Sequence, residues 1–206
     1  MLWGDSAGFW ETVYGNPLLD ATRRLMPASS DRFDEAIFFA KRALEEPAHH
    51  SNINELNWLV GAHLTAFIGI TDAAKIDYER AGREFRCSPF ELEVKLLPDE
   101  DPVSANRAYR DLRNLRTHFA VPLVVLEQRC LVYDIARGEG DRPKERWYFK
   151  RVDWELVRQL NKPRLCELDV VRFNRYLNHH PIIDVMGQML FVAYAVLNQS
   201  ARELDA

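Results

Sequence analysis

The sequence has few cysteines, and none of them are paired at a spacing that suits a metal. Cys87, Cys130 and Cys166 stand far apart and form no CxxC pattern. An odd, scattered set of this kind is typical of free thiols in a reducing compartment. We therefore expect buried free cysteines and a cytoplasmic protein.

Long hydrophobic runs and a basic surplus are missing as well. No apolar run approaches the ~18 residues that a membrane-spanning helix needs, and the opening MLWGDSAGFW lacks the basic-then-apolar layout of a signal peptide. We expect no membrane association. The net charge of −4 argues against a surface that coats nucleic acid broadly, but it allows a small basic pocket. With 47% hydrophobic residues, the 206-residue chain can bury a core.

Several catalytic signatures are absent. There is no HxxxH or HExxH pattern, and the pairs His49-His50 and His179-His180 are adjacent residues, which point about 100° apart on a helix. We expect no metal site. The phosphate loop GxxxxGK[ST], the dinucleotide loop GxGxxG and the hydrolase elbow GxSxG are missing too. We therefore expect no cofactor.

Hydrophobic spacing predicts an all-α protein. Residues 1–30 hold aromatic residues among turn formers and are interpreted as an N-terminal arm, and 31–206 as a single helical domain. At most one small extended segment is expected, at 146–152. The predicted helices span about 31–46, 54–80, 88–97, 101–118, 123–136, 153–160, 167–178 and 182–203.

A proline interrupts the most basic of these segments. Pro122 has no backbone N–H, so the carbonyl of His118 loses its helical partner and the helix is expected to kink or break there. Arg113 and His118 would lie about 140° apart on an ideal helix. A break after His118 would free its side chain from that angle.

The segment RNLRTH carries an arginine, a polar residue and a histidine: Arg113, Asn114 and His118. This pattern resembles the R-x(4–6)-H motif of the HEPN superfamily, in which a polar residue often follows the arginine. Bare spacing also matches at three other places, but only Arg113 is followed by an amide and lies in a long basic helix. The other matches are Arg42…His49, Arg172…His179 and Arg175…His180.

The resemblance implies an antiparallel helical bundle that dimerises and cleaves RNA without a metal. Arg113 would stabilise the phosphorane, His118 would act as general acid or base, and Asn114 would orient the histidine or a phosphate oxygen. The products would be a 2′,3′-cyclic phosphate and a 5′-hydroxyl. Such proteins often act in toxin–antitoxin or antiviral systems, so a cognate antitoxin or a larger defence complex is an expected partner. Basic side chains expected to contact RNA are Arg107, Arg110, Arg116, Lys150 and Arg151.

Two alternatives stay open. One is a non-catalytic HEPN-like subunit that dimerises or binds RNA or protein within a larger complex. The other is a helical scaffold that binds no nucleic acid, in which Arg113 would pair with Asp111 or Glu100 on the outside.

Three other features have simpler interpretations. His63 lies on an apolar face and is expected to be a hydrogen-bonded core residue. Residues 147–149 are aromatic and are expected to form a half-buried edge, with base stacking as the alternative. The Met- and aromatic-rich face within 182–197 is expected to serve the core or a dimer.

Overall fold

The computed structural model describes residues 18–45, 53–94, 101–129 and 144–206. Most of them are helical, which confirms the predicted all-α character. The helices are α2 (Asp20–Leu25), α3 (Pro27–Glu45), α4 (Ile53–Arg80), α5 (Ala105–Phe119), α7 (Trp154–Val157), α8 (Glu167–His179) and α9 (Ile182–Asp205), with a 3-10 turn η1 (Ser88–Phe90).

Extended structure is more abundant than predicted. The described residues contain two separate two-stranded antiparallel sheets, β1 (Glu93–Val94) with β2 (Val103–Ser104), and β3 (Val124–Arg129) with β4 (Lys144–Phe149). The helix predicted over 123–136 is therefore wrong where β3 lies, and its remainder falls outside the described residues. The helix predicted over 88–97 is wrong over 88–94, because in that described part only η1 is helical and β1 follows it, and its last residues fall outside the described ranges.

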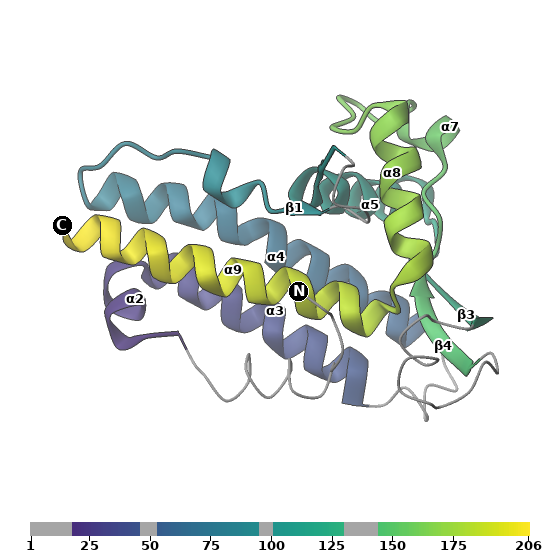
Figure 1. The fold of residues 1–206 in the computed structure, drawn as a ribbon, viewed down its shortest axis with the longest axis horizontal. Coiled ribbons are helices and arrows are strands. Elements are labelled where there is room, and N and C mark those ends of the chain that lie inside the picture. The colour runs from purple at the N-terminus through teal and green to yellow at the C-terminus, as the bar shows by residue number, and fades with distance from the viewer. Residues whose placement is uncertain (1–17, 46–52, 95–100, 130–143) are drawn as a thin grey trace.

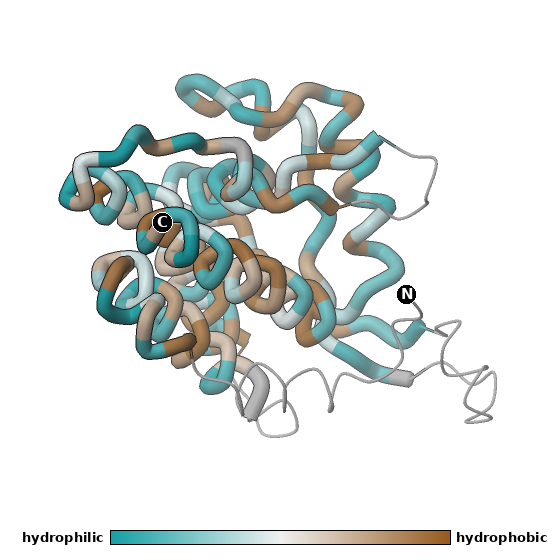
Figure 2. Tube along the Cα trace, turned by 60° about the vertical axis from the view of Figure 1, so that its left-hand side comes forward, coloured by the Kyte–Doolittle hydropathy of each residue, from teal (hydrophilic) through white to brown (hydrophobic). Residues whose placement is uncertain are grey.

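Three long helices form the body of the molecule. In Figure 1, α3, α4 and α9 run side by side, and α8 stands across one end near the β3–β4 hairpin. α3 packs along α4, and α9 packs against α2 and α3. Hydrophobic and hydrophilic residues alternate along the helices in Figure 2. The core lies between the long helices and extends over α5, α8 and the β3–β4 sheet, where Tyr109, Phe173 and Phe149 are buried.

The first helix of the predicted domain starts earlier than expected. α3 begins at Pro27 and not near Asp31, and α2 precedes it. The buried carboxylate of Asp77 accepts hydrogen bonds from the backbone N–H groups of Ala28 and Ser29 at 3.2 and 2.8 Å, which satisfies free donors in the first turn of α3. Residues 1–17 of the predicted arm lie outside the described residues, so the division at residue 30 stays a prediction.

His63 is the core residue that the sequence predicted. Its side chain is fully buried, and its Nδ1 lies 2.9 Å from the carbonyl oxygen of Ala36. Because that oxygen can only accept, Nδ1 carries the proton. Burial lowers the pKa of His63 to about 4, so the ring is neutral at physiological pH.

α4 and α9 are each long and apolar enough to cross a membrane by length and composition alone. The expectation that no apolar segment reaches this length is therefore wrong. Core helices of globular proteins pass the same test, and both helices contribute many buried side chains to the core. This length and composition are only weak evidence for a membrane span.

Three smaller expectations can be compared with the structure. Met186 and Met189 are buried within the chain itself, so of the two expected roles these methionines serve the core. Tyr148 and Phe149 are fully buried and cannot stack on bases. Cys87 and Cys166 are free, as expected, but exposed rather than buried, and Cys130 lies outside the described residues.

Candidate functional site

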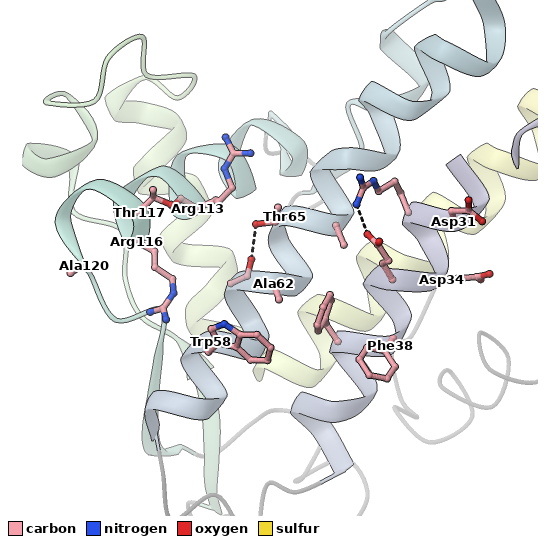
Figure 3. Close-up of a pocket in the computed structure, with 15 residues that line it drawn as sticks. Asp31, Asp34, Phe38, Trp58, Ala62, Thr65, Arg113, Arg116, Thr117 and Ala120 are labelled. Atoms are coloured by element: carbon pink, nitrogen blue, oxygen red, sulfur yellow. Dashed lines mark hydrogen bonds and ion pairs between the residues drawn. The ribbon is translucent and has the colours of Figure 1, made fainter. Parts of the chain in front are cut away.

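An open groove of about 1030 Å³ lies where α5 crosses the α3–α4 pair. Its walls come from α3, α4 and α5, and Figure 3 shows the lining side chains on these three helices. α5 contributes Arg113, Arg116, Thr117 and Ala120; α4 contributes residues from Trp58 to Ala66; α3 contributes residues from Asp31 to Phe39. We call this surface the groove.

The ends of α5 are fixed by local sequence. The side chain of Ser104 accepts a hydrogen bond from the backbone N–H of Arg107 at 3.3 Å and so caps the first turn. The helix ends at Phe119, and Ala120 takes the left-handed conformation, with φ of 53°. The break predicted from Pro122 is therefore confirmed.

Arg113 and Asn114 form a hydrogen-bonded pair. The Nη2 and Nε of Arg113 donate to the Oδ1 of Asn114 at 2.9 and 3.3 Å, and both residues are half-buried. Asn114 uses a neutral acceptor, so it orients the guanidinium without cancelling its charge. The pair thus holds a positive group at the wall of the groove.

Arg116 lies against a glycine of α4. A Cβ placed on Gly61 would meet the Nε of Arg116 at 3.0 Å and its Cδ at 3.1 Å, so a larger residue would push the arginine side chain aside by a few tenths of an ångström. Figure 3 shows the guanidinium of Arg116 directed toward the Trp58 end of the groove. Among the described residues, neither Arg113 nor Arg116 is within ion-pair distance of a carboxylate. The groove therefore carries two cations that are not neutralised by a neighbouring acid.

The opposite wall is acidic but largely neutralised. Arg23 and Asp34 form an ion pair at 2.6 Å, and Arg32 and Glu35 form another at 2.5 Å. Asp31 also lines the groove and has no ion-pair partner among the residues described. The groove is thus basic along α5 and close to neutral along most of α3.

His118 lies apart from the groove, unlike Arg113 of the same motif. Its side chain is exposed near the end of α5 and is not among the residues that line the groove. Within the described part of the chain it has no hydrogen-bond or ion-pair partner. Arg113 and Asn114 are therefore brought together, whereas His118 is not held against them.

The other basic residues proposed for RNA contact are dispersed. Arg107 pairs with Glu91 at 2.9 Å, and Arg110 pairs with Asp72 at 2.9 Å. Neither arginine lines the groove.

Lys150 and Arg151 are exposed and border a small separate cavity of about 110 Å³ beside Pro122. Arg151 also donates to the Oδ1 of Asn178 at 3.0 Å. Of the five residues proposed for RNA contact, only Arg116 lies in the groove.

The scaffold interpretation expected an ion pair between Arg113 and Asp111 or Glu100. Asp111 does not form this pair. It is fully buried and accepts hydrogen bonds from the backbone N–H groups of Arg164 and Leu165, both at 2.9 Å. Burial raises the pKa of this carboxyl, and the two N–H groups partly offset that rise. Its role is to anchor the segment before α8, and Glu100 lies outside the described residues.

The sequence analysis missed the aromatic part of the groove. Phe38 and Trp58 are 57% and 59% exposed, and both lie off the apolar faces of their helices. Large aromatic side chains at solvent-facing helical positions are the signal that would have indicated them.

No three His, Cys, Asp or Glu side chains in the described ranges are grouped so that they can hold a metal ion. Comparisons of the chain with protein-family models, with curated proteins and with solved structures found no match. The resemblance to the HEPN superfamily therefore still rests on Arg113, Asn114 and His118 together with the helical character of the chain.

Proposed function

We propose that this protein binds RNA in the groove and cleaves it as a metal-independent endoribonuclease of HEPN type. The observation that carries the proposal is the Arg113–Asn114 pair. Its guanidinium is half-buried, oriented by a neutral amide and without a carboxylate partner among the described residues. A fixed, permanently charged guanidinium is suited to grip a phosphate with two parallel hydrogen bonds.

The chemistry assigned to these residues is transesterification. The 2′-oxygen attacks the phosphorus and gives its proton to a base, while the bond from phosphorus to the 5′-oxygen breaks and that oxygen takes a proton. Histidine serves both proton transfers because its charge changes near neutral pH. His118 supplies one such group, and a two-fold dimer would supply the second across a shared cleft.

The biological setting belongs to the same proposal. A cytoplasmic homodimer acting in a toxin–antitoxin or antiviral system, with an antitoxin or larger complex as partner, agrees with the HEPN resemblance. The basic α5 wall of the groove supports an anionic substrate.

The test is cleavage of single-stranded and structured RNA by the purified protein in EDTA. Arg113→Ala and His118→Ala are expected to abolish cleavage, and the products of the native protein should end in a 2′,3′-cyclic phosphate. Arg158→Ala and His179→Ala are matched controls, since both residues are exposed and neither lines the groove. Full cleavage by His118→Ala would refute the catalytic assignment.

A second candidate is a non-catalytic RNA-binding subunit. It is favoured by the position of His118, which is exposed and outside the lining of the groove. This function predicts stable RNA binding that Arg113→Ala weakens, with no strand scission over hours. The same experiment separates the two candidates, because only the enzyme yields cyclic-phosphate ends.

A further inference from the structure

Three aromatic rings lie together at one end of the groove. Phe38 and Phe39 have ring centroids 5.4 Å apart, and Phe39 and Trp58 have centroids 6.1 Å apart, both in edge-to-face geometry. Phe39 is half-buried between two outer rings that are more than half exposed. We call Phe38, Phe39 and Trp58 the aromatic shelf.

The rings of the shelf come from two packed helices. Phe38 and Phe39 belong to α3 and Trp58 to α4, and these two helices pack along one another. Edge-to-face contacts with Phe39 favour one orientation of the outer rings before any ligand binds. A ring that is already partly ordered loses less conformational entropy when a ligand binds than a freely mobile ring does.

A cation lies next to the shelf. Arg116 is seated on Gly61, one helical turn along α4 from Trp58, and its guanidinium is directed toward that ring. Arg113 lies farther along the same wall, where the groove continues beside Arg32 and Thr65. The rings therefore lie at one end of a surface along which two arginines follow, and proteins that bind single-stranded nucleic acid combine aromatic rings and positive charges in this way.

We propose that the aromatic shelf is a base-stacking subsite for single-stranded RNA, with a nucleobase against Trp58 and Phe38 and its phosphate on Arg116. This inference rests on the proposed function, because it requires RNA in the groove, and it adds the strand state and the residues that hold a base. A paired base has both faces covered by its neighbours, so only an unpaired base offers a free face to a side chain. The subsite therefore selects single strands over duplexes.

Removing one stacked base or one stacking ring is expected to weaken binding by about 5- to 150-fold, which is the usual range for base–aromatic stacking. The losses of binding free energy from the two removals should not be additive. Once Trp58 is truncated, removing the base that stacks on it should cause little further loss of affinity. This coupling distinguishes a direct stacking contact from a general loss of affinity.

The experiment is a double-mutant cycle on the full chain. Dissociation constants are measured by fluorescence anisotropy with a short, labelled 2′-O-methyl oligonucleotide and with versions that carry one abasic position each. The 2′-O-methyl group removes the nucleophile, so binding is measured whether or not the protein cleaves RNA. Native protein and Trp58→Ala are compared, Trp58→Phe keeps a ring, and Leu168→Ala is the control because Leu168 is an exposed apolar residue of α8 outside the groove.

The expected result is that one abasic position weakens binding to the native protein and to Trp58→Phe but no longer matters in Trp58→Ala. Leu168→Ala should bind like the native protein, and duplex RNA should bind more weakly than the single strand. Thermal unfolding of each variant confirms that it is folded.

Two results would overturn the inference, and they are distinguishable. If the oligonucleotide binds and Arg116→Ala weakens binding, but Trp58→Ala does not or no abasic position couples to it, the stacking subsite is wrong and RNA binding survives. If the native protein binds neither single-stranded nor duplex RNA, the proposed function fails and the subsite fails with it.

Discussion

The buried histidine of the core gives a prediction about stability that does not depend on function. His63 is fully buried beside Phe67 and Tyr109 and keeps its ring neutral, with a pKa of about 4 in the folded protein. The ordinary pKa of a histidine in an unfolded chain is near 6.5. Between these two values the unfolded chain binds a proton that the folded protein excludes.

The sign of the effect follows from this difference. The contribution of His63 to stability is fully present above the unfolded pKa and is lost as the pH falls from about 6.5 toward 4. Each pH unit in this interval is worth about 1.4 kcal/mol, so acidification to pH 4 should lower the free energy of unfolding by about 3 kcal/mol through this residue.

The perturbation is His63→Gln, which replaces the ring by an amide that does not titrate but can still donate to the carbonyl of Ala36. The free energy of unfolding is measured by urea titration at several pH values from 7.5 to 4. The difference between native protein and variant should shrink by about 3 kcal/mol on acidification. The pKa of His180 is also lowered to about 4, first by burial and then by His179, but it titrates in both proteins and cancels from the comparison.

A parallel pH dependence in the native protein and His63→Gln would refute the reasoning. It would mean that the ring takes up a proton without penalty and that the neutral, Ala36-bonded form is not the one that stabilises the core.

Two further predictions concern the groove, tested at Gly61, and the contact between α4 and β3, tested at Asn57. Gly61→Ala should stabilise α4 by up to about 1 kcal/mol through helix propensity. It should also weaken RNA binding, because the new Cβ displaces the side chain of Arg116. Gly69→Ala is the control, since it should stabilise α4 similarly without moving Arg116. Thermal unfolding and oligonucleotide anisotropy measure the two effects, and unchanged RNA affinity in Gly61→Ala would contradict the role of Arg116. Asn57→Ala should lower the free energy of unfolding by roughly 2–5 kcal/mol, measured by urea titration, because the Asn57 Oδ1 accepts two buried backbone N–H groups at the start of β3. A loss below about 1 kcal/mol would show that water or another group replaces that acceptor.

Local sequence was sufficient where the signal was periodic or came from a single residue with strong constraints. The apolar spacing in α4 predicted its length and its buried face, and the burial of His63 on that face is confirmed. The helix predicted over 153–160 begins at Trp154, and Asp153 caps it, because its side chain accepts from the backbone N–H of Glu155 at 2.9 Å. These features depend on contacts within a few residues, so the sequence contains the information needed to predict them.

Local sequence was insufficient where distant segments compete or meet. The run after Pro122 is apolar and short, and such a run suits either a helix or a strand. It became β3 because it pairs with β4, fifteen and more residues away, and because Asn57 of α4 binds its first N–H groups. The sequence of the run itself indicates neither the pairing with β4 nor the contact with Asn57.

The sequence by itself determined that this chain is mostly helical, that its basic helix breaks near His118, and that an amide follows Arg113. Only the tertiary structure decided that this amide orients Arg113, and which arginines pair with a carboxylate among the described residues. Arg107 and Arg110 found carboxylates on other segments, whereas Arg116 was seated on a glycine beside the aromatic shelf. The physical reason is that a charge run specifies which residues are positive, while its neutralisation depends on neighbours that folding brings from elsewhere in the chain.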